Sequence, residues 1–148
     1  MSEDLLLKNT HRRFNPLTGE WVLVCAKRNN RPWQGAEEEE LQDKRVEHDS
    51  SCYLCPRNTR ITGDINPEYD GVYIFKNDFS ALIPLDKMDA INSSLFKAEE
   101  VEGVCRVLCF SPRHDLTLPQ MEVPAIEKVV DAWQQQFTEL SKDYTWVQ

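Results

Sequence analysis

Two closely spaced cysteines are the residues of this chain best suited to chemistry. Cys52 and Cys55 lie in a polar stretch, separated by two residues and followed by Pro56. Two thiolates at this spacing can bind one tetrahedral metal ion, because the turn between them brings both sulfurs to a common point. Free structural thiols and a redox pair are the alternatives. A redox pair usually opens a helix, however, and Pro56 with the polar residues after it gives no helix signal.

A metal ion at this pair needs further ligands, and histidine is the first candidate. Of the three histidines, His48 precedes Cys52 by four residues, whereas His114 follows the end of an apolar segment, a place where side chains often reach a site. The residue types alone do not decide whether His48 or His114 is the further metal ligand. The odd total of five cysteines argues against a disulfide framework.

Positive charge gathers near the N-terminus of an otherwise acidic chain. The net charge is −8, yet six of the 17 Lys and Arg residues lie in residues 8–35, where Glu20 is the only acid. This balance argues against nucleic acid as a partner and favours a small anion. Arg28 and Arg31 are the candidate phosphate ligands, since both can face one anion. The alternative is a solvated basic face.

A few strands and one helix must position these residues. Strands are expected at 21–24, after a turn that ends in Gly19, at 72–75, and at 104–110, which is apolar enough to lie inside a sheet. Another strand is expected to begin at residue 144. Apolar residues at spacings of three, four and seven predict a helix over 123–142. These elements indicate an α+β fold. Asn77-Asp78, after the second strand, is either an ordinary turn or a clamp for sugar hydroxyls.

The N-terminus and the hydropathy bear on location. No apolar run approaches the ~20 residues that span a bilayer, so we expect no membrane partner. The acidic start, residues 1–4, lacks the positive charge of a secretory signal. We therefore expect a cytoplasmic protein.

Several blocks of the sequence form a distinctive set: His11 to Val24, Arg31-Pro32-Trp33-Gln34-Gly35, Cys52-x-x-Cys55, Thr62-Gly63-Asp64, Asn77-Asp78-Phe79 and Cys109-Phe110-Ser111-Pro112. Together these blocks resemble the N-terminal portion of the galactose-1-phosphate uridylyltransferases, which belong to the histidine-triad superfamily. They occur in the family's order and cover essentially residues 1–148. The resemblance implies one N-terminal histidine-triad-like domain, with an antiparallel sheet packed against one long helix. The sheet is expected to be incomplete, which would leave part of the helix's apolar stripe uncovered.

The resemblance also implies a reaction. Family members transfer uridylyl from UDP-glucose to galactose 1-phosphate, in the Leloir pathway of galactose metabolism, through a uridylyl-histidine intermediate. They act as homodimers. By position, Cys52, Cys55 and His114 resemble three ligands of the family's structural zinc. The residues that resemble UDP-sugar contacts are Arg28, Arg31, Ile61, Asn77 and Asp78.

One motif of the family does not occur in these 148 residues. The family's nucleophile is the second histidine of a His-Pro-His triplet, whose first histidine is the fourth zinc ligand, and the sequence contains no such triplet. A second half that carries a further metal site, usually assigned to iron, is also absent. We therefore expect the N-terminal portion of a working enzyme, truncated before the triplet and inactive alone. A non-catalytic UDP-sugar-binding or regulatory protein that pairs with a full-length subunit is the alternative, and a small zinc-stabilised structural domain is a third.

Overall fold

The computed structural model describes residues 9–25, 45–83 and 90–148. The chain groups into two compact units. The first unit comprises Met1–Gly35 with Lys76–Arg106, and the second comprises Ala36–Phe75 with Val107–Gln148. Each unit therefore joins two segments that are distant in the sequence. Side chains of the two segments can meet within one unit.

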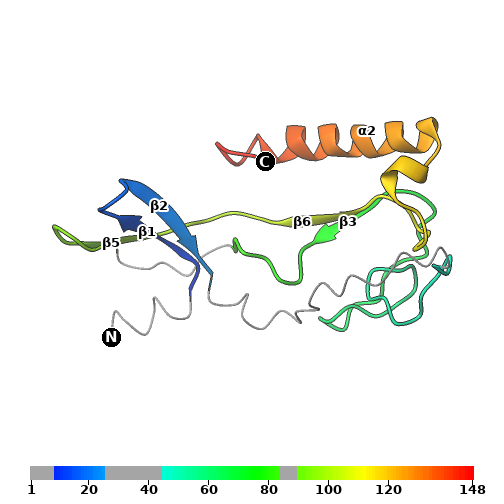
Figure 1. Ribbon diagram of the computed structural model, residues 1–148, viewed down its shortest axis with the longest axis horizontal. Helices are drawn as coiled ribbons and strands as arrows, with labels where there is room; N and C mark the ends of the chain where they lie inside the picture. Colours follow the sequence, from blue (N-terminus) through cyan, green and yellow to red (C-terminus); the bar gives the residue numbers. More distant parts are fainter. Residues whose placement is uncertain (1–8, 26–44, 84–89) are drawn as a thin grey trace. The chain divides into compact units, whose positions relative to one another are not determined.

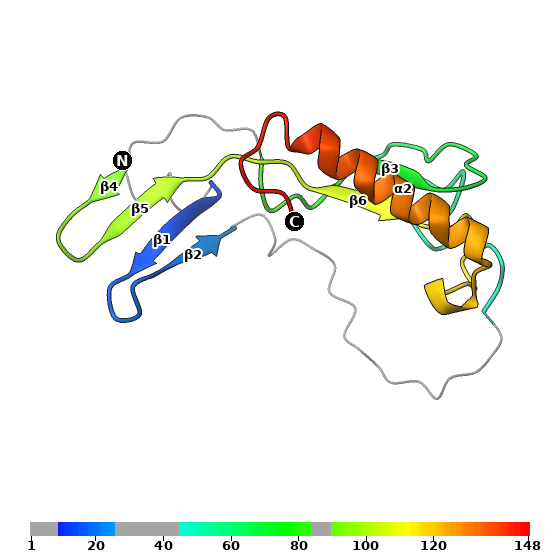
Figure 2. The same ribbon diagram turned by 90° about the horizontal axis from the view of Figure 1, so that it is seen from above.

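The first unit contains a four-stranded antiparallel sheet (Figure 2). In spatial order its strands are β2 (Glu20–Val24), β1 (His11–Asn15), β5 (Lys97–Glu100) and β4 (Ile91–Asn92). The turn between β1 and β2 ends at Gly19, whose N–H donates to the Asn15 carbonyl at 2.8 Å. Gly19 has a φ of 72°, which glycine adopts without steric cost.

Cross-strand side-chain pairs hold this sheet together. Phe14 lies opposite Trp21, and their ring centroids are 5.5 Å apart. The Arg12 guanidinium lies 4.8 Å from the centroid of the Trp21 ring and forms an ion pair with Glu99 of β5. Such pairs connect the β1–β2 hairpin to the β4–β5 hairpin.

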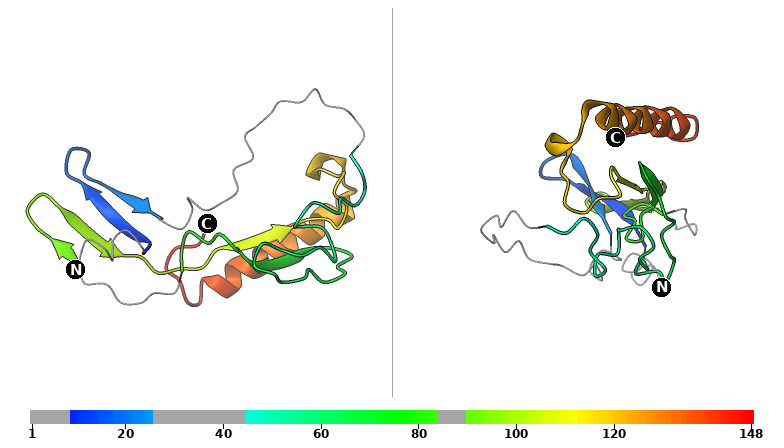
Figure 3. Two further views of the ribbon diagram at one scale, coloured as in Figure 1. Left: turned by 90° about the horizontal axis from the view of Figure 1, so that it is seen from below. Right: turned by 90° about the vertical axis from the view of Figure 1, so that its right-hand side faces the viewer.

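The second unit contains most of a two-stranded sheet and the long helix. The sheet pairs β3 (Tyr73–Lys76) with β6 (Arg106–Cys109). A 3₁₀ turn, η2 (Leu118–Gln120), precedes helix α2 (Val123–Leu140), which lies over one face of the strand pair (Figures 1 and 3). Among the described residues, no helix has the length and hydropathy that a membrane span requires.

The structure confirms part of the expected secondary structure. The turn at Gly19, strand β2 and the long helix are present, and β3 and β6 lie within or next to the expected ranges. Two expectations are wrong. Within the described residues β6 pairs only with β3, so it does not lie inside a sheet. Residues 144–148 form no strand, because no described strand lies beside them to accept and donate the backbone hydrogen bonds of a ladder.

Helix α2 leaves much of its apolar stripe exposed, as expected. Val129 is fully buried, whereas Val130, Trp133 and Phe137 are 49%, 53% and 56% exposed. Pro124 stands in the first turn, where its missing N–H costs no intrahelical hydrogen bond. The helix is therefore secured through one line of its apolar residues.

Candidate metal centre

Two thiols and one imidazole converge in the second unit. Ligand atoms of Cys52, Cys55 and His114 all lie within 4.8 Å of one another, and the Cys55 Sγ lies 3.6 Å from the His114 Nδ1. Cys55 is buried, while the other two are half-buried. All five cysteines of the chain lie in described residues and carry free thiols. The structure thus brings together the three residues that the resemblance implied as ligands.

His48, the other histidine considered from the sequence, has a different place. Its Nε2 lies 3.0 Å from the Pro56 carbonyl oxygen, and it is not part of the cluster. His114 reaches the cysteines because its own backbone N–H donates to the Glu47 carbonyl at 2.8 Å. That bond joins the segment after β6 to the segment before the cysteines.

Two asparagines fix the backbone of residues 52–56, which we call the knuckle. The Asn58 Nδ2 donates to the carbonyls of Asp49 and Cys52 at 2.8 and 2.7 Å. The buried Asn66 Nδ2 donates to the carbonyls of Tyr53 and Cys55 at 2.9 and 3.0 Å. Since each amide holds two carbonyls, these hydrogen bonds order the backbone that presents the two thiols.

A tyrosine completes this support. The Tyr69 hydroxyl donates to the Leu54 carbonyl at 2.8 Å, and its ring stacks on Tyr73 of β3 with 5.0 Å between the centroids. Burial raises the pKa of Tyr69 still further from neutrality. The knuckle is thereby tied to the strand pair.

No pattern in the sequence indicated these supporting residues. Asn58 and Asn66 are ordinary turn residue types, Asn66-Pro67 is typical of a turn, and a single tyrosine in a polar stretch, as at Tyr69, marks no site.

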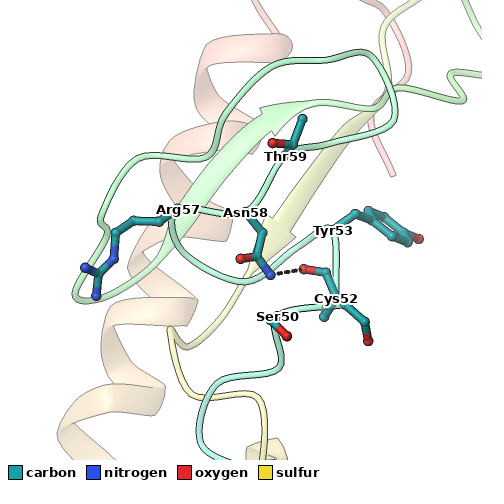
Figure 4. Close-up of a pocket in the computed structure, with 7 residues that line it drawn as sticks. Ser50, Cys52, Tyr53, Arg57, Asn58 and Thr59 are labelled. Atoms are coloured by element: carbon teal, nitrogen blue, oxygen red, sulfur yellow. Dashed lines mark hydrogen bonds between the residues drawn. The ribbon is translucent and has the colours of Figure 1, made fainter.

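A pocket of about 300 Å³ lies beside the knuckle (Figure 4). It is lined by Ser50, Ser51, Cys52, Tyr53, Arg57, Asn58 and Thr59. Arg57 has a φ of 64° and forms an ion pair with Glu68 at 3.2 Å. Of the three cluster residues, Cys52 is the one that lines this pocket.

The donor chemistry of the cluster, together with the distance between Cys55 and His114, is consistent with a zinc ion. Zn–S bonds of about 2.3 Å and Zn–N bonds of about 2.0–2.1 Å put the ligand atoms of a tetrahedral site roughly 3.5–3.8 Å apart. The 3.6 Å between the Cys55 Sγ and the His114 Nδ1 matches this spacing. Burial raises the pKa of the Cys55 thiol, so metal binding there must displace its proton. Among the described residues, the cluster offers three ligands.

The residues considered for a nucleotide are only partly described. Arg28 and Arg31 lie outside the described residues. Ile61 is 50% exposed, in a turn where the Arg60 N–H donates to the Asp64 carbonyl at 2.7 Å.

Asn77-Asp78 lies in the first unit, just after β3. The Asn77 Oδ1 accepts the Phe79 N–H at 2.9 Å, and the Asn77 N–H donates to the Cys105 carbonyl at 2.9 Å. Asn77 therefore forms an ordinary turn, which was one of the two interpretations of Asn77-Asp78; the other was a clamp for sugar hydroxyls. Asp78, which follows it, is half-buried.

Comparisons with known proteins point in one direction. Residues 2–148 match the family model described as galactose-1-phosphate uridyl transferase, N-terminal domain. The chain is 46% identical over 142 residues to the galactose-1-phosphate uridylyltransferase of Haemophilus influenzae, and 49% identical over 143 residues to that of Rattus norvegicus. Each alignment covers 95% of this chain, but only 41% and 38% of the relatives. The chain thus spans about 40% of their length.

A solved structure shares the fold. The chain superposes on a structure titled "Structure of uridylyltransferase" with a TM-score of 0.60 and 20% sequence identity. The superposition covers 90% of this chain and 36% of the other. At this identity the likeness concerns the fold.

Proposed function

The chain belongs to the galactose-1-phosphate uridylyltransferase family, and from this premise we propose that it supplies the UDP-sugar-binding and metal-binding part of such an enzyme. The observation that carries the proposal is the identity of 46% to a relative of that name across 95% of the chain. The reaction proposed for the complete enzyme moves uridylyl from UDP-glucose to galactose 1-phosphate. Residues 1–148 form its N-terminal, histidine-triad-like domain.

The proposed roles follow from the chemistry of each side chain. The guanidinium groups of Arg28 and Arg31 bind the diphosphate through charge-assisted hydrogen bonds. Ile61 offers an apolar surface to the uracil ring, for which its exposure suits it. The Asp78 carboxylate accepts hydrogen bonds from the ribose hydroxyls, and Asn77 shapes the turn that presents it.

Zinc is the metal that we propose for Cys52, Cys55 and His114. The two thiols and the imidazole suit its preference for sulfur and nitrogen ligands. A zinc ion there would stabilise the folded second unit, since metal binding energy is also folding energy. The working enzyme is proposed to be a cytoplasmic homodimer.

A second candidate is a UDP-sugar-binding chain without transfer activity. It is the alternative from the sequence analysis, and it differs from the first proposal only in the transfer step. Under this proposal the chain binds UDP-glucose, but it does not exchange label between UDP-glucose and glucose 1-phosphate by itself. Exchange by the purified 148-residue chain would contradict this candidate.

The test of the proposed function is calorimetric titration of UDP-glucose with Asp78→Ala. Loss of hydrogen bonds to a charged acceptor costs about 1.5–3 kcal/mol, so we expect the Kd to rise roughly 10- to 100-fold. Asp70→Ala, an exposed carboxylate before β3, serves as the matched control and should leave the Kd unchanged.

A nucleotide without ribose hydroxyls sharpens this test. With the 2′,3′-dideoxy analogue, wild type and Asp78→Ala should bind equally. The assignment is wrong if Asp78→Ala leaves the Kd for UDP-glucose unchanged, or if the analogue shows the same loss. Absence of UDP-glucose binding by the wild-type chain would contradict the proposed function itself.

A further inference from the structure

The two carboxylate oxygens of Asp49 face different partners. Its Oδ1 accepts hydrogen bonds from the Ser51 backbone N–H at 2.8 Å and from the Ser51 hydroxyl at 2.7 Å. Its Oδ2 lies 3.9 Å from the His114 Nε2. The first oxygen thus forms the turn that leads into the knuckle, whereas the second meets the imidazole that comes from the other segment of the unit.

The imidazole of His114 likewise has two distinct sides. Its Nδ1 faces the Cys55 Sγ at 3.6 Å, and its Nε2 faces Asp49. A metal ion bound between Cys55 and His114 would therefore take Nδ1 and leave the ring proton on Nε2, directed toward the carboxylate. The separation of 3.9 Å is longer than a hydrogen bond, so the contact between the carboxylate and the ring is electrostatic.

We propose that Asp49 is the positioning residue of the metal site, orienting His114 through Nε2 so that Nδ1 points at the thiols. Histidines that bind metals usually donate the other ring N–H to a carboxylate or carbonyl, which fixes the tautomer and increases the basicity of the ligand. This inference rests on the metal site proposed above. It adds to that site a residue that is not itself a ligand.

The other acidic groups near His114 are engaged elsewhere. Asp115 and Glu47 both pair with the Arg113 guanidinium, at 2.5 and 3.4 Å. Both side chains of the Asp49–His114 pair are about one-third exposed, which screens their attraction only in part.

Asp49→Asn separates the two tasks of this carboxylate. The asparagine keeps one oxygen, which can still accept the hydrogen bonds from Ser51. In place of the oxygen that faces His114 it has an NH₂ group, which only donates and therefore cannot accept the Nε2 proton. Loss of such a partner typically weakens metal binding about 10- to 100-fold, and we expect a loss of this size. Ser51→Ala, which removes only the hydroxyl contact to the turn, should change the affinity less than about 3-fold.

The measurement is competition for Zn²⁺ against a chromophoric chelator, with the visible spectrum of the Co²⁺ form as a second readout. In a His114→Cys background no Nε2 is present, so Asp49→Asn should cause no further loss of affinity. In the His114 background the Co²⁺ spectrum should shift with Asp49→Asn, because the imidazole ligand is reoriented. Circular dichroism of each metal-loaded variant checks folding.

The outcomes separate this inference from the proposed metal site. If the wild-type chain binds neither Zn²⁺ nor Co²⁺, the proposed site itself is wrong. If the wild type binds and Asp49→Asn binds equally well, the positioning role is overturned. If Asp49→Asn is unfolded, His114→Cys is compared with the double variant that also carries Asp49→Asn. A loss of metal affinity in the double variant shows that Asp49 serves the turn alone. An unchanged affinity supports the positioning role.

Discussion

At the scale of single residues, Cys52 is the half-exposed thiol of the cluster and the one beside the pocket. We predict that Cys52→Ser lowers both the metal content and the melting temperature of the metal-replete protein. At a zinc concentration one hundred times the wild-type Kd, abolished binding removes about 2.7 kcal/mol of metal-dependent stabilisation. Cys25→Ser, in the first unit, is the control and should retain the metal. Unchanged metal content and melting temperature in Cys52→Ser would mean that the thiols are merely structural.

Asn66 tests the support of the knuckle, because it is 2% exposed and its amide donates to two carbonyls. Asn66→Asp puts a carboxylate oxygen where the N–H groups were, against the carbonyls of Tyr53 and Cys55. We expect the free energy of unfolding to fall by roughly 2–4 kcal/mol, from the lost hydrogen bonds and the buried charge. Urea denaturation measures this. Asn92→Asp, an exposed change of the same kind on β4, should stay within about 0.5 kcal/mol of wild type, and similar losses in both variants would contradict the prediction.

At the scale of elements, α2 tests how far one buried line of side chains secures a helix. Val129 is fully buried, and its neighbour Val130 is 49% exposed. We predict that Val129→Ala lowers the free energy of unfolding by roughly 1–3 kcal/mol, because two buried methyl groups are removed and a cavity remains. Val130→Ala should change it by less than about 0.5 kcal/mol. Thermal denaturation of the two variants is the measurement, and equal losses would mean that α2 packs along a different line.

Helix α2 could be predicted because its signal is local, whereas much of the sheet could not. The apolar residues of 123–142 repeat with the helical period, and Pro124 marks the start. Strands β1 and β5 lack an apolar alternation, since Arg12-Arg13 stands in one and Ala98 is the only apolar residue of the other. Their pairing comes from contacts distant in sequence, such as Arg12 with Glu99. No periodicity encodes such a contact.

The candidate site divides in the same way. The spacing of Cys52 and Cys55 is a local signal of a metal pair, but His114 is 59 residues from Cys55, and the residue types alone left it level with His48. Resemblance to the family was needed to choose His114. Asp49 carried no signal at all, because an aspartate in a polar loop is ordinary and only the fold brings its Oδ2 to the imidazole.

At the scale of the whole molecule, the division into two units predicts where the effect of metal will be felt. Cys52, Cys55 and His114 all belong to the second unit, and the four-stranded sheet belongs to the first. Metal bound by the cluster connects the segment before β3 with the segment after β6. Removal of the metal should therefore lower the local stability of the second unit, because it cuts one link between its two segments.

Hydrogen exchange followed by mass spectrometry tests this coupling on the metal-loaded and chelator-treated chain. Backbone amides of the knuckle and of residues 111–116 should exchange at least tenfold faster without metal, since a loss of about 1.4 kcal/mol in the opening free energy already gives that factor. Peptides from β1 and β2 should keep their rates. Because the metal binds only the folded second unit, equal acceleration in both units would mean that they unfold as one cooperative body. Acceleration confined to the second unit would mean that the metal stabilises this unit alone and that its loss leaves the first sheet intact.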